Sequence, residues 1–115
     1  MTETDYQATL RTIQSEQDAV MKELRTVDKQ QQELFQLNQE EQRLYSDVSA
    51  SCTPEERPFF QDRGTDGLQQ HRKAQQWLEE KEETLKKEKK DLLNTEEEVI
   101  REQRSNQMKQ EETED

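Results

Sequence analysis

Few residues of this chain have the types and spacing that metal binding or catalysis requires. The segment from Asp62 to Gly67 places Asp at the first and fifth positions of a calcium-binding loop and Gly at the sixth. Position three is Gly64, however, and position twelve is Lys73, where a bidentate Glu is needed. Because Gly and Asp are also common turn residues, we interpret this segment as a turn.

The other reactive side chains stand alone in the sequence. His71 is the single histidine and Cys52 the single cysteine, so neither has a neighbouring His or Cys ligand for zinc, and Cys52 has no internal disulfide partner. The basic run Lys86–Lys90 follows several Glu residues on the same predicted helix, which indicates a solvated, salt-bridged face. A general acid–base site would also need a concave pocket. We therefore predict a protein that is not an enzyme and holds no metal or cofactor.

The composition indicates long helices instead of a compact globule. Of the 115 residues, 26% are hydrophobic and 39% charged, and the mean hydropathy is −1.51. Such a chain would resemble a disordered one, but it contains only two Gly and two Pro and is rich in Glu, Gln, Lys and Leu, which favour helix. Narrow apolar stripes on long helices fit these numbers best.

The net charge of −11 disfavours nucleic acid and anionic membrane surfaces as partners. The sequence has no apolar run of the roughly 18 residues that crossing a bilayer requires, so we expect no membrane insertion. The first residues lack the basic and apolar regions of a signal peptide. We expect a cytoplasmic location, with co-secretion alongside a partner left open.

The first predicted helix spans about residues 4–51, with Thr4 as its cap. Its apolar positions alternate in steps of four and three, the heptad pattern of a helix packed on another helix; they are Tyr6, Leu10, Ile13, Val20, Leu24, Val27 and Leu34, with Gln17 and Gln31 at the two remaining positions. After Leu34 the stripe shifts to Leu37, Leu44 and Val48, with Phe35 and Tyr45 on its flank. Either a local overwinding or a widened face that contacts a further helix explains the shift.

The second half is predicted to fold back along the first. Small polar residues and Pro54 end the first helix, a short helix and turn occupy about 53–67, and a helix follows over about 68–107. Its apolar stripe repeats every seven residues at Leu78, Leu85, Leu92 and Val99. An acidic tail at 108–115 is expected to be frayed. We predict an all-α, antiparallel two-helix hairpin that is coiled-coil-like, forms a single domain over 1–115 and belongs to a larger helical bundle.

Trp77 lies beside the apolar stripe of the last helix, and a single partner helix cannot bury it fully. It is either packed on the first helix or an anchor for a partner protein, because Trp is enriched at binding hot spots. The candidate interface residues are those of the stripe and its aromatic flank: Leu24, Val27, Leu34, Phe35, Leu37, Tyr45, Trp77, Leu78, Leu85, Leu92 and Val99.

The second half carries a pattern that resembles a known family. It reads Pro58-Phe59-Phe60, His71-Arg72-Lys73-Ala74 before Leu78-Glu79-Glu80, Lys89-Lys90-Asp91-Leu92-Leu93 and Glu96-Glu97-Glu98. These segments resemble the LXG-associated α-helical proteins of Gram-positive type VII secretion systems. That resemblance implies a helical hairpin shaped like the WXG-type secreted proteins, although this chain has no Trp-x-Gly turn and no Tyr-x-x-x-Asp/Glu export signal.

Two functions follow as alternatives. The resemblance implies an accessory, targeting or chaperone protein that binds the helical N-terminal LXG domain of a toxin, in some complexes together with a second small helical protein. The heptads alone also fit a self-associating structural protein, a homodimer that forms a four-helix bundle. A thin apolar stripe has little area to offset the conformational entropy of folding, which favours a helical partner.

Overall fold

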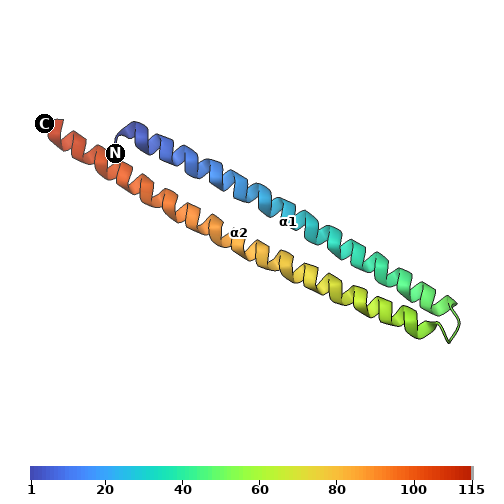
Figure 1. Cartoon of the computed structure of the whole chain (residues 1–115). Coiled ribbons are helices and arrows are strands. Elements are labelled where there is room, and N and C mark those ends of the chain that lie inside the picture. The colour runs from blue at the N-terminus through green and yellow to red at the C-terminus, as the bar shows by residue number, and fades with distance from the viewer. Residues whose placement is uncertain (115) are drawn as a thin grey trace. The chain divides into compact units, whose positions relative to one another are not determined.

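The computed structural model describes residues 1–114, and within them the secondary structure is helical, with no strand. Helix α1 spans Glu3–Ser51 and helix α2 spans Arg57–Glu114 (Figure 1). A short connection between Ser51 and Arg57 joins them. The predicted fold class, an all-α helical hairpin, is confirmed.

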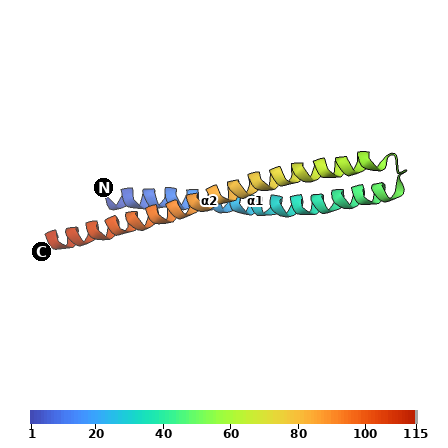
Figure 2. The ribbon, with the colours of Figure 1, turned by 90° about the horizontal axis from the view of Figure 1, so that it is seen from below.

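The helical hairpin divides into two compact units. Unit 1 combines Met1–Leu24 with the chain from Thr84 onward, and unit 2 is the continuous stretch Arg25–Glu83, which includes the connection. In unit 2 the α1 and α2 segments lie side by side and run in opposite directions (Figure 1 and Figure 2). In unit 1 the pairing joins residues far apart in sequence, because Gln103 donates a hydrogen bond to Glu3.

Threonine side chains cap the first turn of α1 and the turn that precedes α2. At α1 the cap is Thr2 and not the predicted Thr4, because the Asp5 amide donates to Thr2 Oγ1 over 3.2 Å and the Thr2 amide donates to Asp5 Oδ2 over 2.9 Å. The hydrogen bonds from Thr2 lower the pKa of Asp5. Before α2, Thr53 Oγ1 accepts from the Glu56 amide over 3.3 Å, the contact of a capping threonine.

Helix α2 runs without interruption through Gly64–Gly67, where the sequence predicted a turn. Neither glycine has a positive φ, so neither is used for a turn conformation. Gly64 is buried, and a Cβ at this position would lie 3.4 Å from Tyr45 Cβ. This is an ordinary van der Waals distance, so the contact with Tyr45 leaves room for a Cβ at Gly64. Helix α2 also continues through most of the acidic tail, to Glu114, where fraying was expected.

Each unit has its own small apolar core on the seam, the set of positions at which α1 and α2 face each other. Four side chains in unit 1 are buried: Tyr6, Ile13, Val20 and Leu85. In unit 2 the buried apolar side chains are Val27 and Leu78, which are 1% and 5% exposed. Unit 2 thus buries less apolar material, although it spans the connection and much of both helices.

Candidate functional site

In unit 2 the seam of α1 keeps its heptad register beyond Leu34. Half-buried positions follow at Asn38, Glu41, Tyr45 and Val48, in steps of four, three, four and three. Leu37 and Leu44 therefore do not continue the seam, since they are 57% and 61% exposed, whereas Val48 lies on it. The physical reason is that polar side chains occupy the seam here, while the leucines lie beside it. Of the two explanations for the shift, exposed leucines are compatible with a widened face.

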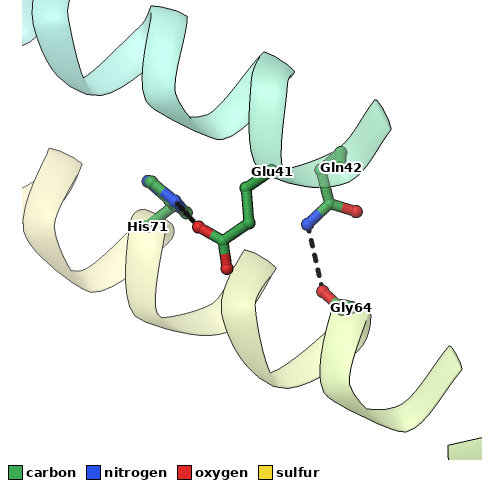
Figure 3. A network of polar contacts seen from close by, with 4 residues as sticks. All are labelled: Glu41, Gln42, Gly64 and His71. Atoms are coloured by element: carbon green, nitrogen blue, oxygen red, sulfur yellow. Dashed lines mark hydrogen bonds and ion pairs between the residues drawn. The ribbon is translucent and has the colours of Figure 1, made fainter. Parts of the chain in front are cut away.

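Hydrogen bonds between the helices satisfy part of this polar seam. His71 Nε2 lies 2.8 Å from Glu41 Oε2, and Gln42 Nε2 donates to the Gly64 carbonyl over 3.0 Å (Figure 3). The His71 side chain is only 15% exposed, so its contact with the carboxylate is partly shielded from water. Half-buried polar pairs between two helices add little net stability, and in some coiled coils such polar residues specify the register.

Further along the seam, Gln31 Nε2 donates to Glu82 Oε2 over 2.8 Å. Two other buried polar atoms, Asn38 Oδ1 and His71 Nδ1, have no hydrogen-bond partner. A buried polar atom without a partner costs free energy, so this stretch of the seam holds the helices together less strongly than an apolar one would.

One side of unit 2 presents exposed apolar side chains from both helices. Leu37, Leu44 and Trp77 are 57%, 61% and 59% exposed, and together we name them the Trp77 strip. Leu37 and Trp77 line a single groove whose other apolar residues are Leu34, Ala74 and Leu78. Leu44 follows Leu37 by seven residues, about two helical turns, and so lies on the same face of α1. The Trp77 ring also holds Lys81 Nζ 5.2 Å from its centroid.

The candidate interface residues separate by exposure. Val27, Leu78 and Leu85 are buried within the chain. Leu24, Leu34, Tyr45, Leu92 and Val99 are half-buried seam residues. Only Phe35, Leu37 and Trp77 are exposed. Most of the predicted interface thus belongs to the packing of α1 on α2, and these three side chains remain available to a partner.

Phe35 lies apart from the Trp77 strip. It lines a pocket with Asn38, His71 and Gln75, and the groove of Leu37 and Trp77 does not include it. Leu44 belongs to the Trp77 strip but was missing from the candidate interface residues. Its seven-residue spacing from Leu37 was the signal that could have identified it.

Metal binding and thiol chemistry were the other possibilities considered from the sequence. Across residues 1–114, no group of three or more His, Cys, Asp or Glu side chains is arranged to hold a metal ion. Cys52 is a half-buried free thiol that donates to the Ser49 carbonyl. Neither α1 nor α2, over the residues described, contains a stretch apolar and long enough to cross a membrane.

Comparison with known proteins identifies the family of the chain. No curated protein and no solved structure matches it. One family model does match, that of DUF3958, described as a protein of unknown function, and the match covers residues 4–106. This range includes nearly all of α1 and the part of α2 that carries Trp77, and so the whole Trp77 strip. The chain therefore belongs to the DUF3958 family of proteins of unknown function.

Proposed function

We propose that this protein is a binding protein that accepts a helix of a partner on the Trp77 strip. The observation that carries the proposal is the exposure of Leu37, Leu44 and Trp77 on one side of unit 2. Large apolar side chains gathered on one face mark interaction surfaces in soluble proteins. Trp is also the residue type that most often dominates the energy of an interface.

The weak apolar core of unit 2 supports the same proposal. Its buried apolar side chains are Val27 and Leu78, and its seam contains the Glu41–His71 contact and the unpartnered Asn38 oxygen. A third helix laid along the Trp77 strip would bury apolar area worth about 25 cal/mol per Å². Binding would therefore stabilise the hairpin as well as the complex.

For the partner, we propose the helical N-terminal LXG domain of a type VII secretion toxin, with this protein as its accessory, targeting or chaperone subunit. Support for this choice comes from the resemblance of the second half, from Pro58-Phe59-Phe60 to Glu96-Glu97-Glu98, to LXG-associated helical proteins. An LXG domain would supply the long amphipathic helix that the Trp77 strip needs. In this role the protein is made in the cytoplasm and leaves the cell, if at all, together with its toxin.

The test is co-purification with an LXG domain encoded beside this protein, followed by size exclusion with light scattering. We expect a stable hetero-complex, and we expect Trp77→Ala to weaken it by about 2 kcal/mol or more, roughly 30-fold in affinity. Leu93→Ala is the matched control, because Leu93 is also exposed, at 45%, but lies in unit 1. A homodimer that ignores the LXG domain would contradict the proposal and favour the self-associating alternative.

A further inference from the structure

Acidic residues border the Trp77 strip along α1. Glu33, Glu40 and Asp47 recur every seven residues, so they form one row about 10 Å apart along the helix. Glu33 lines the same groove as Leu37 and Trp77. All three acidic residues are exposed. We name these three residues the acidic row.

The spacing along α1 places the acidic row next to Leu37 of the Trp77 strip. Glu33 precedes Leu37 by four residues and Glu40 follows it by three, so both are neighbours of Leu37 on the surface of α1. A helix that packs on the Trp77 strip would place the residues that flank its apolar stripe opposite these carboxylates. In helical bundles, charges at such flanking positions select the partner and its orientation.

We propose that the Trp77 strip binds an amphipathic helix with a basic flank, that is, with Lys or Arg residues beside its apolar stripe. Its apolar stripe packs on Leu37, Leu44 and Trp77, and its Lys or Arg residues recur every seven positions opposite the acidic row. This inference rests on the proposed function and adds the chemistry of the partner helix. The net charge of −11 acts in the same direction, because it attracts a basic segment and repels an acidic one.

A second copy of this chain does not offer such a flank. The matching row on the other side of the Trp77 strip, next to Trp77 on α2, consists of Asp66, Lys73 and Glu80, again at seven-residue intervals. Two of its three members are acidic. If one Trp77 strip packed on another, the acidic row would therefore face either itself or a row with an acidic majority. The occupant that complements the surface is a different, basic helix.

The test measures binding of two synthetic helical peptides to the full chain by fluorescence anisotropy. Both peptides carry the same leucine stripe, and they differ only in having Lys or Glu at every seventh flanking position. We expect the Lys peptide to bind about five- to tenfold more tightly, as three exposed charge pairs allow, and the difference to shrink with added salt. The triple variant Glu33→Gln, Glu40→Gln, Asp47→Asn should remove most of the preference, leaving only the weak part that comes from the remaining net charge.

A matched variant controls for net charge. Gln32→Lys, Gln39→Lys and Ser46→Lys raise the net charge by the same amount. These three positions lie about 100° around α1 from the acidic row, on the side away from Leu37 and Leu44, so the preference should persist. Equal affinity for the two peptides, binding of neither, or a preference that is as large without the acidic row as with it would overturn the inference. So would a homodimer that buries the Trp77 strip. If the peptide experiment fails but Trp77→Ala still weakens the LXG complex, the proposed function stands and only the basic flank of the partner helix is refuted.

Discussion

Trp77 and Leu78 are neighbours in the sequence, yet the structure assigns them opposite roles. Leu78 is 5% exposed and Trp77 is 59% exposed. Leu78→Ala should lower the free energy of unfolding by about 2–5 kcal/mol, the usual cost of removing a buried leucine. Trp77→Ala should change it by less than about 1 kcal/mol, because the ring is largely in water and Ala has the higher helix propensity.

The assay for this pair is urea unfolding followed by far-UV circular dichroism, since the variant at Trp77 has no tryptophan signal. Leu85→Ala is a useful reference, because Leu85 is 4% exposed and should lose as much stability as Leu78. If Trp77→Ala were as destabilising as Leu78→Ala, Trp77 would belong to the packing of α1 on α2. The Trp77 strip would then not be available to a partner.

Three other substitutions test particular contacts. Gly64→Ala should stabilise the chain by about 0.5–1 kcal/mol in urea unfolding, because a Cβ fits there and Ala favours helix; a loss of stability would indicate a turn. Glu41→Ala should cost about 1 kcal/mol in the same assay by leaving His71 Nε2 without its partner, and no loss would mean that water replaces the carboxylate. Hydrogen bonds from Thr2 lower the pKa of Asp5, so the carboxylate should stay ionised in the folded protein below the ordinary carboxyl pKa. Its contribution to the stability of the first turn of α1 should be lost as pH falls through the lowered pKa. Asp5→Asn should remove this pH dependence from the amide chemical shifts of that turn, and an unchanged dependence would contradict the assignment.

The fold could be predicted from the sequence because the heptads are long and the breaks are few. The buried positions Ile13, Val20 and Val27 all lie on the predicted stripe of α1, and Leu78 and Leu85 lie on that of α2. Both helices therefore follow from the spacing of apolar residues and from the turn residues between them.

Two local errors have different causes, and the first is that the seam of unit 2 is polar where an apolar one was assumed. Apolar spacing led the prediction to Leu37 and Leu44, although Asn38 and Glu41 occupy the seam. Gly64 indicated a turn by its residue type, but it lies inside α2, packed against Tyr45, about twenty residues away in the sequence. Contacts of this kind between distant residues do not leave a periodic signal.

The Trp77 strip itself could be predicted only in part. The exposure of Phe35, Leu37 and Trp77 is compatible with the predicted interface, but the sequence did not distinguish them from seam residues such as Leu34. Separating the two sets requires knowing which side of each helix faces the other.

The most direct test of the central claim is the accessibility of the tryptophan, because Trp77 is the only one in the chain. Quenching of its fluorescence by acrylamide should be efficient in the protein alone and strongly reduced once an LXG domain is bound. The emission should shift to shorter wavelength at the same point of the titration. A complex that forms while Trp77 remains as accessible as before would contradict the claim that the partner helix binds on the Trp77 strip.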